Sequence, residues 1–173
     1  MLYLDVRQRF PFDDETFDYV FTEHLIEHVT FEEGESMLRE CHRVLKPAGR
    51  IRVSTPDLDR LLGLWRNREQ ELPQRYVRWV IDSFLPHLAQ RGKYHPVHVI
   101  NSMFQNWGHL FLYNADLLKA TLEEAGFSGV ETVAHGESSD PELRGVEAHG
   151  VIVENVDMVR YEALAVEGQK AGR

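Results

Sequence analysis

The sequence is poor in cysteine, in long apolar runs and in positive charge. A single cysteine among 173 residues excludes a disulfide framework. Cys41 falls in an apolar helical pattern, which predicts a core residue rather than a nucleophile. No apolar run is long enough to span a bilayer, and the start "MLYLDVRQRF" lacks the features of a secretory leader. We therefore expect a single-domain cytoplasmic protein with no membrane partner.

The charge balance argues against a nucleic-acid partner. The formal net charge is −9, which repels phosphate backbones. Arginines between residues 66 and 91 are interspersed with acidic residues, a pattern typical of a solvated helix face. These arginines are Arg66, Arg68, Arg75, Arg78 and Arg91, and the acidic residues among them are Glu69, Glu71 and Asp82.

Residues 1–56 have the strand, helix, strand pattern of an α/β protein. "LYLDV" and residues 17–22 predict two strands that are separated by an Asp-Asp turn. Thr30 and Glu33 form a capping box before a run of apolar residues at helical spacing, and "KPAG" ends that helix. "RIRVSTP" predicts the next strand, so we expect a parallel crossover unit.

Residues 57–113 differ in character and predict a helical insertion or lid. Apolar stripes that start at Leu58 and near Pro73 have helical spacing. Residues 91–113 have weak periodicity and many aromatic residues, so we expect a pocket wall there. His95 and His98 flank a proline in this segment and are predicted to lie in a loop.

The remaining residues are expected to complete the same domain, 1–173. Residues 114–155 predict a helix capped by Asn114 and an antiparallel strand pair, "GVETVA" and "GVIVEN". Residues 156–173, which end in "EGQKAGR", are expected to be a tail.

The segment "EHLIEH" raises the question of a metal site. His24, Glu27 and His28 have the H-x-x-E-H spacing of a class of zinc proteases, and a helix would place them on one face. A predicted strand precedes the segment and a helix cap at Thr30 follows it, which leaves at most about two turns of helix. We therefore assign no metal ligand, and a small metal-dependent enzyme that uses these residues remains an alternative.

A longer stretch, "FPFDDETFDYVFTEHLIEHVTFEEGESMLRECHRVLKPAGRIRVSTPD", resembles the middle of class I S-adenosylmethionine-dependent methyltransferases of the type 11 kind. Their pattern is an acidic residue, L-P-F, a turn, S-F-D, a short helix bearing E-H, and R-V-L-K-P-G-G before a strand. The resemblance covers residues 2–56, returns at "YNADLLKATLEEAGFSGVETV" and is loose over residues 57–107. It implies a Rossmann-like α/β fold and S-adenosylmethionine as the cofactor.

The family's cofactor turn, G-x-G-x-G, has no counterpart in this sequence, in which no two glycines are two residues apart. If "LYLDV" corresponds to the family's third strand, the fold is N-terminally truncated and its first two strands are missing. We then expect weak or no cofactor binding by this chain alone. The fourth strand would have a free edge, so we expect a homodimer or a completing chain to pair with it.

The resemblance also assigns candidate cofactor residues. Asp5 would contact the adenine amino group, although it equally suits a turn at a strand end. Phe10 and Phe12 would line the adenine pocket or pack beneath it. Thr22 and Glu23 follow the fourth strand, where the family's cofactor and substrate meet.

The implied activity is methyl transfer to a small-molecule or glycan acceptor. An oxygen acceptor benefits from a base that removes its proton, and His24 and His109 are the candidates. Glu27 and His28 match the family's E-H, and they either support a metal or bond neighbouring loops. A catalytically inactive interaction subunit, which binds a partner through its sheet edge or acidic surface, remains a further alternative.

Overall fold

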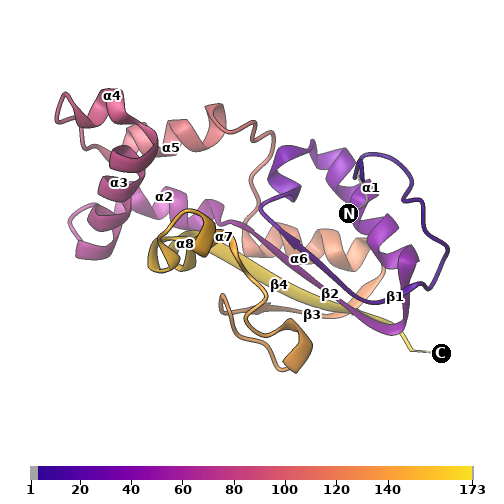
Figure 1. Ribbon diagram of the computed structural model, residues 1–173. Coiled ribbons are helices and arrows are strands. Elements are labelled where there is room, and N and C mark those ends of the chain that lie inside the picture. Colours follow the sequence, from indigo (N-terminus) through magenta and orange to yellow (C-terminus); the bar gives the residue numbers. More distant parts are fainter. Residues whose placement is uncertain (1–3, 173) are drawn as a thin grey trace.

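The computed structural model describes residues 4–172, which contain a four-stranded mixed sheet (Figure 1). The strands are β1 (Phe17–Glu23), β2 (Leu45–Pro56), β3 (Phe127–Val133) and β4 (Ala163–Lys170), and their order is β1-β2-β4-β3. β1 and β2 are parallel, as the crossover pattern predicts, whereas β4 is antiparallel to both of its neighbours. The α/β fold predicted from the sequence is confirmed.

Helices form two groups around this sheet (Figure 1). α1 (Phe31–Val44) and α6 (Ala115–Glu124) pack against each other and against the sheet. The other helices lie beyond the carboxyl ends of β1 and β2: they are α2 (Leu58–Arg66), α3 (Glu71–Phe84), α4 (Pro86–Ala89), α5 (Pro96–Gln105), α7 (His149–Ile152) and α8 (Val156–Glu162). Two 3-10 turns, η1 (Ile26–His28) and η2 (Pro141–Leu143), complete the elements.

Each group of helices has its own apolar core. The first core lies between the sheet and α1 and α6, and it includes Leu38, Cys41 and Ile51, as predicted for Cys41. The second core lies among α2, α3, α5 and α8, and it includes Leu64 and Val80. The boundary between the two cores, called the seam below, contains polar residues such as His24, His109 and Glu162.

Local helix signals in the sequence are confirmed. Thr30 accepts a hydrogen bond from the Glu33 amide, and the Glu33 side chain accepts one from the Thr30 amide, which completes the capping box. Asn114 accepts from the Leu117 amide at the start of α6. The segment "EHLIEH" starts with Glu23, the last residue of β1, and forms no helix longer than the short turn η1, because the α1 cap at Thr30 follows.

For three segments, the secondary structure predicted from the sequence is wrong. Leu4, Asp5 and Val6 form no strand, and the rest of "LYLDV", Leu2 and Tyr3, lies outside the described residues. "GVIVEN" forms α7 and a turn instead of a strand, with Val151 70% exposed. The expected tail is the central strand β4, in which Glu167 is fully buried beside Arg52. Glu167 pairs with Arg52 on the neighbouring strand β2, and this ion pair allows a charged residue in a buried strand. For this reason β4 lacks the apolar sequence expected of a central strand.

The expected loop around Pro96 is also wrong. His98 lies in α5, and His95 is its N-cap, whose Nδ1 accepts a hydrogen bond from the Val97 amide. Proline is tolerated at the first position of a helix because its missing N–H has no partner there.

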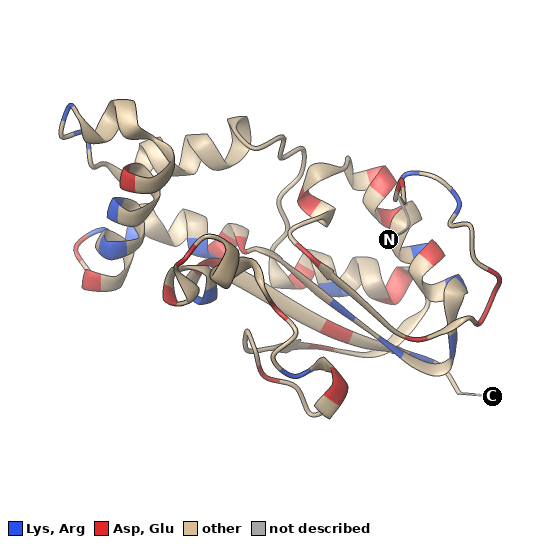
Figure 2. Cartoon of the chain, viewed as in Figure 1, with Lys and Arg blue, Asp and Glu red and all other residues tan. Residues whose placement is uncertain are grey.

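Charged residues of both signs alternate over the helical group (Figure 2). Arg68 lies over the ring of Trp65 and 3.5 Å from the Glu69 carboxylate, and Arg78 lies over the ring of Tyr94. Among the described helices, none is long and apolar enough to cross a membrane.

Candidate functional site

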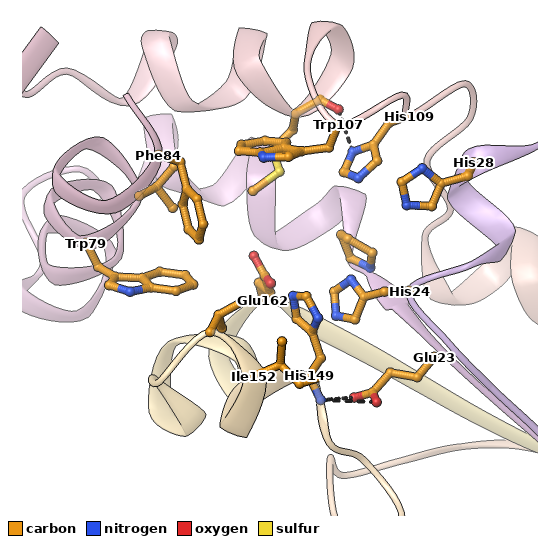
Figure 3. Close-up of a pocket in the computed structure, with 14 residues that line it drawn as sticks. Glu23, His24, His28, Trp79, Phe84, Trp107, His109, His149, Ile152 and Glu162 are labelled. Carbon is orange, nitrogen blue, oxygen red and sulfur yellow. Dashed lines mark hydrogen bonds between the residues drawn. The ribbon is translucent and has the colours of Figure 1, made fainter. Parts of the chain in front are cut away.

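A cavity of about 460 Å³ opens at the seam between the two cores (Figure 3). Its floor is the carboxyl end of the parallel strands, with Glu23 at the end of β1, His24 directly after it and Pro56 at the end of β2. Open α/β sheets bind their ligands at this end. The remaining lining residues are His28, Trp79, Val80, Phe84, Met103, Trp107, His109, His149, Ile152, Val153 and Glu162.

His24 is held in a strained and specific position. Its φ angle is 47°, a left-handed conformation that costs free energy in a residue with a side chain, and its amide donates to the Ser54 carbonyl. Its Nδ1 lies 3.2 Å from Oε1 of Glu27, which is fully buried. Thr55 donates a 2.9 Å hydrogen bond to the other Glu27 oxygen. The His24 ring is therefore oriented with Nε2 away from Glu27.

The contact between His24 and Glu27 also sets their charges. Burial alone would lower the pKa of His24, but the Glu27 carboxylate outweighs it and raises that pKa. Burial would raise the pKa of Glu27, but contact with His24 and Thr55 lowers it. The two directions agree, since each group of the pair favours the charged form of the other.

His149, which is distant from His24 in the sequence, lies beside it in the cavity. The Glu23 carboxylate accepts hydrogen bonds from the amides of Ala148 and His149, which anchors the start of α7 (Figure 3). The rings of His24 and His149 stack with centroids 3.8 Å apart. Burial, followed by the charge of His24, lowers the pKa of His149.

Glu162 completes this group at the end of α8. It is buried, and its Oε2 accepts a hydrogen bond from the hydroxyl of Tyr76 in α3. Burial raises the pKa of Glu162 to about 7. We call His24, His149 and Glu162 the histidine cluster; Figure 3 shows the three side chains side by side in the cavity.

His109 lies on the opposite wall, in the segment between α5 and α6. Its Nδ1 is 2.8 Å from the Met103 carbonyl, which can only accept, so Nδ1 carries the proton and Nε2 has a free lone pair. Its ring lies edge-on to that of His28, with centroids 4.9 Å apart. Burial lowers the pKa of His109, which favours the neutral ring.

Comparison with known proteins identifies the fold. A family model described as a methyltransferase domain matches residues 2–53. A chain of the complex between the Haloferax volcanii Trm112 methyltransferase activator and a methyltransferase superposes with a TM-score of 0.53 and 15% identity, over 99% of this chain. A SAM-dependent methyltransferase from Archaeoglobus fulgidus has a TM-score of 0.52 and 15% identity, over 98% of this chain. This chain has the class I methyltransferase fold.

The likeness extends to a human enzyme but not to the full length of any of these structures. Human N-acetylserotonin methyltransferase, solved in complex with SAM, has a TM-score of 0.51 and 13% identity over 98% of this chain. This chain spans 61%, 66% and 33% of the lengths of the three structures, respectively. Comparison with curated proteins finds no match.

The methyltransferase fold brings only some of the predicted residues to the cavity. Glu23, His24 and His109 line it. Thr22 and Glu23 are the last two residues of β1 and do not follow the strand as expected, and the buried Thr22 hydroxyl has no hydrogen-bond partner among the described residues.

The predicted adenine-site residues have other partners. The carboxylate of Asp5 is paired with Arg7 at 2.9 Å. Phe10 is buried in the first core, and Phe12 packs edge-on against Phe17. None of the three lines the cavity, and their assignment to the cofactor stays a prediction.

His149 and Glu162 were not predicted from the sequence. The H-x-x-E-H spacing groups His24 with Glu27 and His28, which are close in the chain. In the described residues, two groups have ligand atoms within 4.8 Å of one another: the histidine cluster, and Glu27 with His28 and His109. No local signal marks His149 or Glu162, because each reaches the cavity through a tertiary contact.

Proposed function

We propose that the protein is an S-adenosylmethionine-dependent methyltransferase that modifies a hydroxyl group of a small-molecule or glycan acceptor. The observation that carries the proposal is the cavity at the carboxyl ends of β1 and β2, which has a neutral histidine in its wall. Its volume suits a small molecule, and its aromatic rings suit a flat acceptor such as a phenol or a sugar ring.

The described residues fit one end of the cofactor. Trp79, Phe84 and Trp107 offer aromatic faces, which attract a sulfonium cation. The predicted adenosine contacts lie outside the cavity. The cofactor would therefore be held at its methyl-bearing end by these walls, where it would supply an activated methyl group.

The acceptor is activated by His109. Its Nε2 can take the proton of an acceptor hydroxyl, while the Met103 carbonyl fixes the ring by binding Nδ1–H. The aromatic walls exclude water and hold the acceptor in one orientation, which supplies most of the acceleration for transfer from an activated donor. His24 is less suited to this step, because Glu27 favours its protonated form.

The test combines binding with transfer. S-adenosylhomocysteine should bind in the range of about 0.1–1 mM by saturation-transfer-difference NMR, since only part of the cofactor is held. Radiolabelled S-adenosylmethionine should label at least one member of a panel of phenols and monosaccharides. His109→Asn should lower that rate by about 10²–10⁴-fold with little change in acceptor KM, and exposed His98→Asn should not. Absence of S-adenosylhomocysteine binding would overturn the proposal.

We also propose that β1 pairs with a strand of a second copy of this chain. Among the described strands, β1 pairs only with β2, so its other edge is open. Tyr19 and Phe21 on this strand are 41% and 37% exposed. Light scattering after gel filtration should show a dimer, and Phe21→Lys should dissociate it. A monomer at all concentrations would refute the pairing, and co-purification with a different protein would replace it.

A further inference from the structure

The histidine cluster has the donor atoms of a metal site. Ligand atoms of His24, His149 and Glu162 all lie within 4.8 Å of one another. Nε2 of His24 is buried and has no hydrogen-bond partner among the described residues. Because the two rings stack with an interplanar angle of 30°, their edges face the same space, next to the Glu162 carboxylate (Figure 3).

Each member of the cluster is held by a partner on the side away from that space. Glu27 contacts Nδ1 of His24 at 3.2 Å, and Tyr76 donates to Glu162. Glu23 fixes the backbone of His149. Metal ligands in proteins are typically oriented by such outer partners, above all a carboxylate on the far nitrogen of a histidine.

We propose that His24, His149 and Glu162 bind a divalent transition-metal ion of the zinc class, with an open coordination position toward the cavity. Two imidazoles and one carboxylate form a common catalytic zinc set, which leaves a position for water or a substrate oxygen. Two nitrogen donors disfavour Mg²⁺ and Ca²⁺, which prefer oxygen ligands. The inference rests on the donor set alone and does not depend on the proposed methyl transfer.

The second group of possible ligands is less suitable. Glu27, His28 and His109 also lie within the same distance limit. Both oxygens of Glu27 already face partners, Thr55 and His24, so this carboxylate orients a ligand rather than serving as one.

The experiment is calorimetric titration of tag-free, chelator-treated protein with Zn²⁺. We expect one ion per chain, and no binding of Mg²⁺ at the same concentrations. His149→Ala and Glu162→Gln should each weaken Zn²⁺ binding by on the order of 100-fold or more. Glu27→Gln should weaken it by about 10–100-fold, as expected for loss of an orienting partner.

Matched variants separate this site from other histidines. His98→Ala removes an exposed histidine outside the cavity, and His28→Ala removes a member of the second group only. Both should keep wild-type Zn²⁺ affinity, and circular dichroism should show all variants folded. Absence of Zn²⁺ binding, wild-type affinity in either His149→Ala or Glu162→Gln, or a selective loss in His28→Ala would each overturn the proposal.

Discussion

Two buried polar clusters of this protein differ in whether they contain their own cation. The arginine cluster is Arg52, Glu147 and Glu167: the guanidinium of Arg52 contacts both carboxylates and donates to the carbonyls of Glu137 and Ala134. The histidine cluster places a buried carboxylate beside two imidazoles, with one imidazole nitrogen unpartnered.

The difference separates a structural role from a candidate functional one. The arginine cluster holds the segment after β3 against the sheet, and this segment leads to His149. Its two carboxylates face two guanidinium groups, those of Arg52 and Arg50, so it needs no further cation. The histidine cluster borders the cavity and is balanced only when a cation binds or a proton is taken up. Both clusters contain a buried carboxylate, but only the second lines the cavity, where Nε2 of His24 lacks a hydrogen-bond partner among the described residues.

The largest expected effect comes from removing the internal cation. Arg52→Met removes the ion-pair partner of the buried Glu147 carboxylate and leaves Glu167 with only Arg50 and Ser138, and this should lower the free energy of unfolding by about 3–5 kcal/mol. Urea denaturation measures the change. Arg39→Met, at an exposed position of α1, is the control and should change it by less than about 0.5 kcal/mol. A cost for Arg52→Met as small as that of the control would show that the arginine cluster is not needed for stability.

Adding a cation to the histidine cluster should have the next largest effect. Zn²⁺ at 100 times its Kd should raise the free energy of unfolding by about 2.7 kcal/mol, because only the folded chain assembles the three ligands. Thermal denaturation with and without Zn²⁺ measures this shift. The same Zn²⁺ concentration should leave His149→Ala unchanged. If that variant is stabilised as much as the wild type, the ion binds elsewhere.

A smaller effect is expected from the residue that supports Glu27. Thr55→Val removes a hydrogen bond to a buried carboxylate and should cost about 1–3 kcal/mol of stability, with weaker Zn²⁺ binding. Thr121→Val is a matched control, since Thr121 donates only to the carbonyl of Leu117 within α6. It should cost about 0.5–1.5 kcal/mol without changing Zn²⁺ affinity. Equal Zn²⁺ affinity in both variants would show that Thr55 does not position His24.

The smallest effect concerns the charge of His109. Burial lowers its pKa, and the charges of His28 and His24 act in the same direction, whereas the Met103 carbonyl and Glu27 oppose them. In NMR titration the His109 ring should therefore have a midpoint below 6.5, and His109→Asn identifies its signal.

The lowered pKa of His109 determines how its contribution to stability depends on pH. A histidine whose pKa is lowered by folding contributes fully to stability above about pH 6.5, and this contribution is lost as the pH falls toward the lowered pKa. A midpoint above 6.5 would contradict the neutral, proton-accepting ring in our proposed function.

Much of the fold was predictable from local patterns. The capping box at Thr30, the Asn114 cap and the apolar spacing of α1, α2, α3 and α6 each depend on residues a few positions apart. The parallel pairing of β1 and β2 follows from the crossover helix between them. The resemblance to methyltransferases led to the correct fold class, and three of the residues it singled out, Glu23, His24 and His109, line the cavity.

Other elements were not predictable, because long-range contacts decide them. β4 is a central strand since Glu167 pairs with Arg52, which lies more than a hundred positions earlier in the chain. "GVIVEN" has the composition of a strand, yet Glu23 binds the amides at the start of α7 and turns this segment into a cavity wall.

The sequence by itself determined the α/β class, the capped helices and the buried Cys41, because each depends on periodicity or on near neighbours. The tertiary structure alone decided that His24 faces His149 and Glu162 instead of joining His28. Those partners come from segments far apart in the chain, and their meeting depends on buried charges that balance only when the sheet is assembled.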